Sequence, residues 1–254
     1  SGQRARPEGR DALLNALRET LARAPRLAPV VPDLPFSGGL VGVSAYDLVR
    51  HFERLPHAPS HPDNPQVPEA AYLAAESLLV FDHLPRRIAL LHAGTEAERL
   101  QLRAGVIRLL RGAVPAAPVA GRQDSTGQSL SREQFLQAVA ASKASISRGD
   151  VYQLVVSVQF TGTHSLAPFE AYRALRLLNP SPYMFFIDLG DIQVAGSSPE
   201  ALVKLRRGHA SLRPIAGTRP RGATPEQDVA HEQSLLADEK ENSEHVMLVD
   251  LARN

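Results

Sequence analysis

The chain has 254 residues and carries 28 Lys and Arg against 27 Asp and Glu, a formal net charge of +1. This balance argues against a dedicated nucleic-acid binder, because such proteins meet phosphates with a basic surplus. The absence of cysteine excludes disulfides, thiolate zinc sites and cysteine nucleophiles. No apolar run approaches the length needed to span a bilayer, so we expect a cytoplasmic protein that binds neither nucleic acid nor membrane.

The N-terminal region begins with a helical pattern. Leucines recur at helical spacing within residues 11–26, which predicts an amphipathic helix. Residues 36–43 are typical of a turn that enters a buried strand. Residues 56–70 are rich in Pro, His and Asn and therefore predict an exposed loop.

A hairpin and a helix are predicted next. Leu78–Asp82 and Arg87–His92 are apolar runs typical of two paired strands. Thr95 and Glu98 have the spacing of a capping box, in which each side chain bonds the other residue's backbone N–H. This signal predicts a helix that extends to about Leu110.

Residues 113–130 contain turn formers and small residues but no apolar periodicity. They are the best candidate for an internal linker, although a loop within one domain has the same composition. We therefore expect two parts, residues 1–130 and residues 131–254.

The second part opens with another capped helix. Ser131 and Gln134 form a second capping-box pair, and Gly149 is typical of a helix end. The apolar run at residues 151–160 predicts a strand. A further helix is expected over residues 168–179, because Pro180 cannot continue the helix ladder.

Four short strand patterns follow, separated by turn residues: Tyr183–Leu189, Ile192–Ala195, Ala201–Arg206 and Ala210–Arg213. Asp238 and Glu241 predict a third capping box, which opens the terminal helix. Runs of antiparallel strands separated by helices indicate the α+β class, since a doubly wound sheet alternates regularly.

One face of the terminal helix carries four residues at the spacing i, i+3, i+4 and i+7: Glu241, Glu244, His245 and Leu248. Two carboxylates on one face can bind Mg²⁺, which accepts one or two protein carboxylates and keeps its waters. A solvated face, or a capping box that uses Glu241, explains the same spacing. A single His beside two Glu lacks the spacing of a helical zinc motif.

The segment Pro214–Gly222 is a second candidate for a binding site. Gly217 lets the backbone approach a ligand closely, and Thr218 offers a hydroxyl and an N–H. Arg219 and Arg221 could bind carboxylates bidentately. A rigid loop framed by prolines, with solvated arginines, is the alternative.

The segment Gly196–Glu200 delivers a carboxyl group from a strand end into a turn. A partly desolvated Glu200 could act as a general acid there, or it could be a surface glutamate. The chain has no serine nucleophile elbow, Walker loop or dinucleotide-binding glycine motif.

Five stretches occur in one order along the chain: Gly149–Gln153, Asn179–Met184, Gly196–Glu200, Pro214–Gly222 and Asp238–Asn254. Together they resemble the chorismate-utilising enzymes, and within that family the anthranilate synthase component I branch. The resemblance implies a large α+β fold of two packed β-sheets with outer helices, which this chain covers only in part.

The resemblance also implies roles for individual residues. Glu244 would be a Mg²⁺ ligand, with Glu241 beside it, and the metal would hold the ring carboxylate of chorismate. Gly217 and Thr218 would contact chorismate. Glu200 would protonate the departing C4 hydroxyl, since loss of hydroxide needs an acid.

Two positions separate the branches of the family. Water-adding members carry a lysine base where Gln153 stands, and glutamine cannot deprotonate water. Aminodeoxychorismate synthases carry a lysine nucleophile where Ala216 stands. The resemblance therefore implies direct addition of ammonia at C2, the ammonia coming from a glutamine amidotransferase subunit. The phenazine-type enzyme, which stops at the aminated intermediate, and aminodeoxychorismate synthase remain alternatives.

In anthranilate synthases, Pro182, Tyr183 and Met184 would line a pocket for feedback inhibition by L-tryptophan. The Leu-Leu-Glu-Ser motif that forms the other half of that pocket is absent from this sequence. The family's second Mg²⁺ carboxylate, its catalytic His and its chorismate-clamping Tyr and Arg are also not found. We therefore expect this chain alone to be inactive. A truncated scaffold that binds the glutaminase subunit is the non-enzyme alternative.

Overall fold

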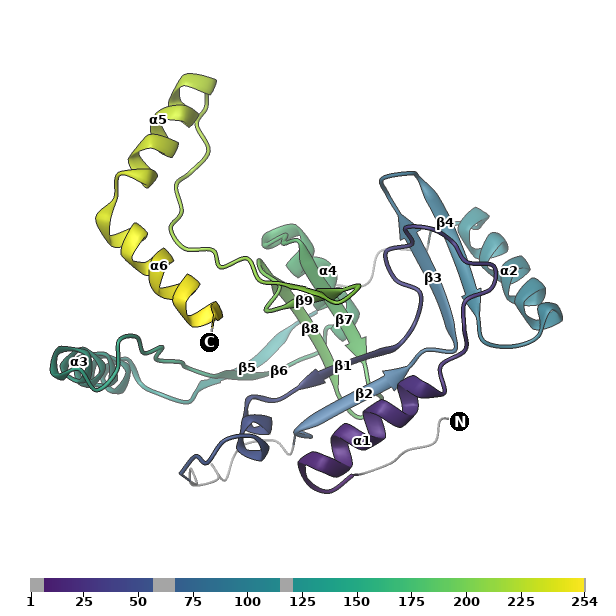
Figure 1. The fold of residues 1–254 in the computed structure, drawn as a ribbon, viewed down its shortest axis with the longest axis horizontal. Helices are drawn as coiled ribbons and strands as arrows, with labels where there is room; N and C mark the ends of the chain where they lie inside the picture. Colours follow the sequence, from purple (N-terminus) through teal and green to yellow (C-terminus); the bar gives the residue numbers. More distant parts are fainter. Residues whose placement is uncertain (1–6, 57–66, 115–120, 254) are drawn as a thin grey trace. The chain divides into compact units, whose positions relative to one another are not determined.

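The computed structural model describes residues 7–56, 67–114 and 121–253 (Figure 1). It forms two compact units: the first contains residues 1–117 and 187–193, and the second contains residues 118–186 and 194–254. The boundary expected at residue 130 stays a prediction. Most of the loop predicted over residues 56–70 lies outside the described residues.

The first unit begins with helix α1 (Gly9–Ala22). The helix ends before residue 26, where the sequence pattern placed its end, because Pro25 disfavours helical backbone at the residue before it. Strand β1 (Leu40–Ser44) confirms the predicted entry into a strand and pairs antiparallel with β2 (Ala70–Ala74). A short 3₁₀ helix, η1 (Tyr46–His51), follows β1.

The predicted hairpin is confirmed. Strands β3 (Ser77–Asp82) and β4 (Arg87–His92) pair antiparallel over their full lengths. Helix α2 (Glu96–Arg111) then begins with the predicted capping box. The N–H of Glu98 donates to Thr95 Oγ1 at 3.3 Å, and the N–H of Thr95 donates to Glu98 Oε2 at 2.7 Å.

The Thr95 cap supports a stability prediction. Thr95→Ala should lower the free energy of unfolding by about 1 kcal/mol in urea denaturation, whereas Thr95→Ser, which keeps the hydroxyl, should change it little.

Hydrogen bonds from Thr95 hold the pKa of Glu98 below its usual range. A lowered carboxyl pKa stabilises the fold above the unfolded-state value of about 4.3, and the benefit disappears as pH falls through the folded-state value. The difference between the wild-type protein and Thr95→Ala should therefore shrink in acid; an equal difference at about pH 7 and about pH 3 would contradict this.

The second unit begins with a strand that the sequence pattern did not reveal. Strand β5 (Gln123–Gln128) lies inside the predicted linker and pairs antiparallel with β6 (Phe160–His164). The strand predicted over residues 151–160 is wrong except at Phe160, where β6 begins. Within the described chain, residues 151–159 have no neighbouring strand, and an apolar run without a partner forms no ladder.

Helix α3 (Arg132–Arg148) lies between β5 and β6 in the order of the chain, and both of its predicted ends are confirmed. The N–H of Gln134 donates to Ser131 Oγ, and the N–H of Ser131 donates to Gln134 Oε1. Gly149 ends the helix with a left-handed φ of 80°, a conformation that glycine adopts without a steric penalty.

Helix α4 (Pro168–Leu178) ends before Pro180, as predicted. It is followed by the two-stranded ladder of β7 (Tyr183–Asp188) and β8 (Gln193–Ser198). The helix packs on β7 through aromatic rings: the centroids of Phe169 and Phe186 are 5.2 Å apart in an edge-on arrangement.

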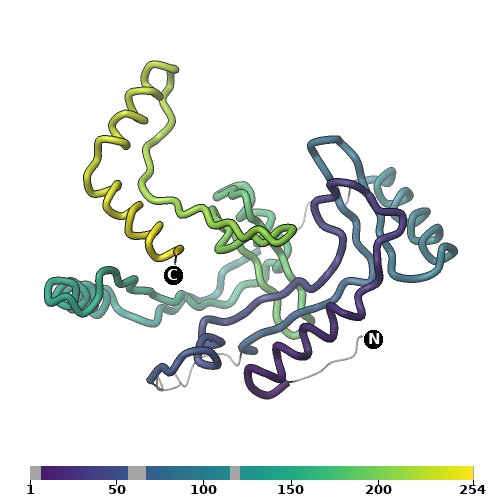
Figure 2. Tube along the Cα trace, viewed as in Figure 1, coloured from purple at the N-terminus to yellow at the C-terminus, as the bar shows by residue number. Residues whose placement is uncertain are grey.

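A second, shorter ladder joins β9 (Lys204–Arg206) to β10 (His209–Ser211). The chain then runs through the loop at residues 212–224 into α5 (Pro225–Leu236) and α6 (Glu239–Arg253), as the trace in Figure 2 shows. Helix α5 was not predicted, although Thr224 followed by Pro225 is a recognised helix start.

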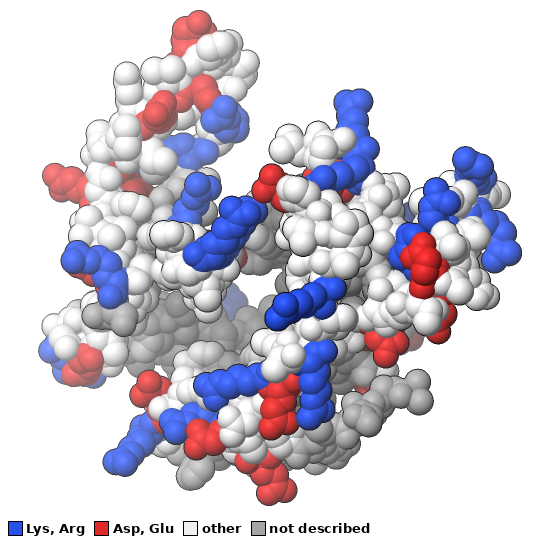
Figure 3. Space-filling view, turned by 45° about the vertical axis from the view of Figure 1, so that its right-hand side comes forward, with Lys and Arg blue, Asp and Glu red and all other residues white. Residues whose placement is uncertain are grey.

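The α+β class is confirmed, because every described strand lies in a two-stranded antiparallel ladder and helices connect or flank these ladders. None of the described residues is buried, and large apolar side chains such as Leu84 and Leu202 are 96% and 87% exposed. The apolar faces of both units are therefore open rather than closed into a core. Acidic and basic side chains are interspersed over the face shown in Figure 3.

Candidate functional site

The N-terminus of α6 is held by Asp238. Asp238 Oδ1 accepts the N–H groups of Lys240 at 3.1 Å and Glu241 at 3.2 Å. The predicted capping box is wrong in its second half, because the N–H of Asp238 bonds to the carbonyl of Leu235 instead of to Glu241. The pKa of Asp238 lies below its usual range, chiefly because the N–H of Glu241 donates to its carboxylate, and next because Arg219 does.

The loop Pro214–Gly222 lies against this helix start. Arg219 Nη2 donates to Asp238 Oδ2 at 2.7 Å, and Arg219 Nη1 lies 3.8 Å from Glu241 Oε1. Arg221, two residues further, pairs instead with Asp228 of α5 at 2.8 Å. Both arginines therefore bind carboxylates of this chain, and Arg219, whose side chain is 25% exposed, is not a solvated residue.

Gly217 allows the loop to approach α6 closely. A methyl group added at this position would lie 2.9 Å from Leu235 Cδ1 and 3.1 Å from Glu241 Oε2. The residue also has a φ of +73°, in the left-handed region that favours glycine. The structure thus gives Gly217 a packing role beside the ligand contact that the sequence suggested. Thr218, the next residue, is exposed.

Glu244 lies one turn further along α6 and is half-buried. Among the described residues, none forms a hydrogen bond or an ion pair with its carboxylate, so the group is free to bind a cation. Within the same ranges, no three His, Asp or Glu side chains form a ready-made metal cluster. One free carboxylate with Glu241 nearby still fits Mg²⁺, which needs only one or two protein carboxylates.

The segment Gly149–Gln153 also lies beside α6. Tyr152 lines a hollow of about 430 Å³ together with residues of α6: Ser243, Val246, Met247, Asp250 and Leu251. Its neighbour Gln153 is exposed. Two of the five characteristic stretches therefore lie against α6, which belongs to a third.

The other two stretches meet at the β7–β8 ladder. Ser197 Oγ donates to the carbonyl of Asn179 at 2.6 Å, which ties Gly196–Glu200 to Asn179–Met184. Gly196 leaves room for the ring of Phe185, with which an added methyl group would clash. Glu200 is half-buried, and its carboxylate has no partner among the described residues.

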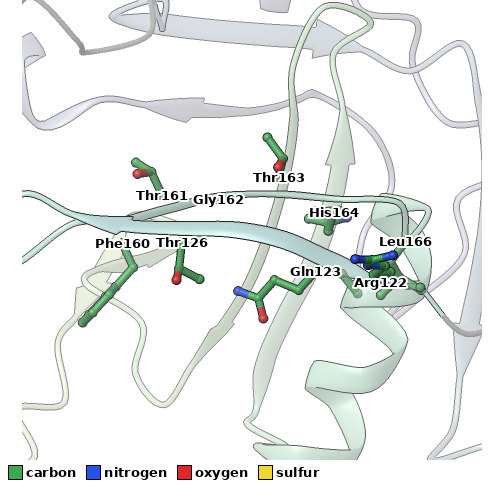
Figure 4. A pocket seen from close by; sticks show the side chains of 11 residues that line it. Arg122, Gln123, Thr126, Phe160, Thr161, Gly162, Thr163, His164 and Leu166 are labelled. Atoms are coloured by element: carbon green, nitrogen blue, oxygen red, sulfur yellow. The ribbon is translucent and has the colours of Figure 1, made fainter.

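The candidate inhibitor residues lie where β7 begins. Pro182 is exposed, Tyr183 is 49% exposed and Met184 is half-buried. The structure thus places the predicted residues in two groups, one on α6 and one on β7–β8, and no hydrogen bond or ion pair between described residues joins them. None of them lines the hollow of about 410 Å³ along β5–β6, which Figure 4 shows.

The model of one protein family, the chorismate binding enzymes, matches residues 2–254. The chain belongs to the chorismate-binding enzymes. No helix in the described part of this family member is long and apolar enough to cross a membrane.

Two curated relatives in this chorismate-binding family carry the name anthranilate synthase component 1. The protein of Thermus thermophilus is 43% identical over 227 residues, which cover 88% of this chain and 49% of the relative. The protein of Streptomyces coelicolor is 43% identical over 266 residues, which cover 98% of this chain and 51% of the relative. The chain spans about half the length of the curated relatives it matches.

The fold also matches a solved structure of this chorismate-binding family, anthranilate synthase component I from Streptococcus pneumoniae TIGR4. The TM-score is 0.78 at 31% sequence identity, over 96% of this chain and 54% of that chain. The expected family fold, covered only in part by this chain, is confirmed.

Sequence reasoning missed the partnership of Arg219 with Asp238. The residues lie 19 positions apart and in different elements, so no helical or strand spacing connects them. The only available signal was compositional: a cation in a glycine-containing loop, and an acid at a helix start.

Proposed function

We propose that this chain carries part of the chorismate site of an anthranilate synthase large subunit. The observation that supports this most is the packing of Gly217 and Arg219 against the first turn of α6, one turn before the unpaired carboxylate of Glu244. This packing brings backbone groups of the loop close to an acidic helix face. Such an arrangement suits a substrate carboxylate, which the acidic face would bind through a cation.

Binding of the substrate would use the α6 group. Glu244, supported by Glu241, would hold Mg²⁺, and the backbone of Gly217 and Thr218 would contact chorismate. Bound Mg²⁺ would offset the negative charge of the ring carboxylate and fix its position. A fixed ring lowers the entropic cost of attack by an external nucleophile.

The nucleophile in this proposal is ammonia. Its nitrogen adds at C2 of the ring and then loses a proton, both ring double bonds shift, and the C4–oxygen bond breaks with release of water. Neutral ammonia needs no base, which suits Gln153, and Ala216 offers no amine for a covalent adduct. Elimination of the enolpyruvyl group as pyruvate, with loss of the C2 proton, then gives anthranilate.

Glu200 would supply the proton that turns the leaving C4 hydroxyl into water. Its half-buried carboxyl group has no competing partner among the described residues, which leaves it available to a substrate. The two groups of residues would then act on opposite ends of the reaction, carboxylate binding at α6 and proton donation at the end of β8.

The relatives' name, component 1, supports a second subunit as the source of ammonia. We propose a glutamine amidotransferase in that role and a cytoplasmic place for the complex in tryptophan biosynthesis. The phenazine-type enzyme shares the same first step and differs by retaining the enolpyruvyl group.

The test is a product assay on the full-length protein that contains this chain. With chorismate, Mg²⁺ and an ammonium salt at alkaline pH, it should release anthranilate and pyruvate, and glutamine should replace ammonia only when the amidotransferase subunit is added. Isochorismate or salicylate as the main product would refute the role of Gln153, and aminodeoxychorismate that of Ala216. An aminated intermediate without pyruvate would identify the phenazine-type enzyme.

Tryptophan inhibition is a separate expectation. Pro180 and Pro182 stiffen the segment before β7, and the aromatic and thioether groups of Tyr183 and Met184 suit an indole ring. The full-length enzyme should be inhibited by L-tryptophan, and Met184→Thr should weaken inhibition more than it lowers turnover. Calorimetry on the present chain should detect no tight tryptophan binding; tight binding would mean that other segments build the site.

A further inference from the structure

Arg219 connects two segments that the proposed function needs in one place. Its guanidinium contacts three groups: it donates to Asp238 Oδ2 at 2.7 Å and to the Thr218 carbonyl at 3.1 Å, and it lies 3.8 Å from Glu241 Oε1. The side chains of Arg219, Asp238 and Glu241 are 25%, 33% and 23% exposed. The cation is thus partly shielded from water, where a charged hydrogen bond is stronger than at an open surface.

Asp238 transmits this contact to the helix. One of its carboxylate oxygens accepts from Arg219, while the other accepts the N–H groups of Lys240 and Glu241 at the start of α6. The same carboxylate therefore fixes both the loop and the helix terminus. Gly217 allows close packing at the same place, because its missing side chain lets Leu235 and Glu241 lie against the loop.

The charges favour the same arrangement. Asp238 directly precedes α6, and Glu241 and Glu244 lie in the first two turns of that helix. Arg219 is the cation that the described structure sets against the first two, and it leaves Glu244 without a counter-charge. Arg219 therefore offsets the charges of Asp238 and Glu241 and leaves Glu244, the carboxylate that would bind the metal, unpaired.

We propose that Arg219 is the positioning residue of the chorismate site: through Asp238 and Glu241 it holds the Gly217–Thr218 backbone at a fixed distance from Glu244. This inference rests on the proposed function. Glu244 lies on α6 and keeps its place on that helix when Arg219 is replaced. The Gly217–Thr218 backbone would contact chorismate in the ground state and the transition state alike, so its displacement raises KM while kcat is nearly unchanged.

The experiment compares three variants of the full-length protein. Arg219→Gln removes the cation, and Asp238→Asn keeps an acceptor for the helix cap while it removes the ionic partner. Arg221→Gln is the matched control, because Arg221 belongs to the same loop, is 90% exposed and pairs with Asp228 on α5. With saturating ammonium salt and Mg²⁺, Arg219→Gln and Asp238→Asn should each raise the KM for chorismate by at least about tenfold, with kcat within about threefold of wild type. Arg221→Gln should keep the wild-type KM.

Two further measurements separate positioning from general stability. Hydrogen exchange at residues 214–222, measured without substrate or metal, should accelerate in Arg219→Gln and stay unchanged in Arg221→Gln. Arg219→Lys, which keeps the charge but not the fork of donors, should recover part of the lost chorismate affinity.

The inference is overturned if Arg219→Gln has the KM of wild type, if it matches Arg221→Gln, or if it loses kcat at unchanged KM as a partly unfolded enzyme would. Should Arg219→Gln fail to fold, Asp238→Asn decides by the same criteria. Failure of the proposed function itself has a different signature: the wild-type protein then makes no anthranilate, while the exchange experiment still reports on the loop.

Discussion

Glu244→Gln should abolish turnover while the protein remains folded. The amide is nearly isosteric with the carboxylate but carries no charge, so Mg²⁺ would lose the ligand that we propose for it on α6. A metal that polarises and fixes a substrate carboxylate supplies several kcal/mol to the transition state, so we expect a fall of at least about 1,000-fold in kcat/KM. Anthranilate release measured by fluorescence over a range of Mg²⁺ concentrations checks this.

The matched control is Glu239→Gln, an exposed acid in the first turn of the same helix. If Glu244 had only a structural role, both variants would change stability by a fraction of a kcal/mol through the helix dipole and leave turnover intact. Mn²⁺ titration followed by electron paramagnetic resonance adds a reading that does not depend on activity, with weaker binding expected only for Glu244→Gln. Wild-type activity of Glu244→Gln at limiting Mg²⁺ would remove the residue from the site.

Glu200→Gln should lower kcat by about 100- to 10,000-fold, the usual contribution of a positioned general acid. The KM for chorismate should stay near the wild-type value, because the proton is delivered to the C4 oxygen and not to the carboxylate that anchors the ring. Steady-state kinetics at saturating ammonium salt measures both constants.

A chorismate analogue whose C4 group leaves without protonation provides the sharper test of Glu200. It should restore most of the rate to Glu200→Gln and little to Glu244→Gln, since only the first variant lacks the proton donor. Glu232→Gln, an exposed acid on α5, serves as the control and should behave as wild type. Equal loss with both substrates would show that Glu200 acts in some way other than proton donation.

The predictions that the structure confirmed concern neighbours in the chain. The capping pairs at Thr95 and Ser131, the left-handed Gly149 and the β3–β4 hairpin all depend on residues only a few positions apart or on one tight turn. Their hydrogen bonds form at one helix end or between two strands joined by a short turn, so residue type and spacing are sufficient to predict them. The order of the five characteristic stretches along the chain was likewise sufficient to indicate the family.

Strand formation, by contrast, did not follow from local composition. β5 is entirely exposed and largely polar, and it forms a ladder because backbone groups pair, which residues of almost every type can do. Conversely, the apolar run before Phe160 has the composition of a strand but no partner strand among the described residues. Whether a strand forms therefore depended on a partner more than 30 positions away, which local composition does not reveal.

For the candidate site, too, local motifs and long-range contacts must be distinguished. The sequence by itself was sufficient to name the candidate residues, since carboxylates, a glycine and a threonine in recognisable motifs can be named without coordinates. Only the tertiary structure decided that Arg219 binds Asp238 across 19 positions, that Glu241 lies against Gly217 rather than closing a capping box, and that Glu244 keeps a free carboxylate. The physical reason is that an ion pair depends on the distance between two charges in space, and that distance is set by how the loop packs on the helix.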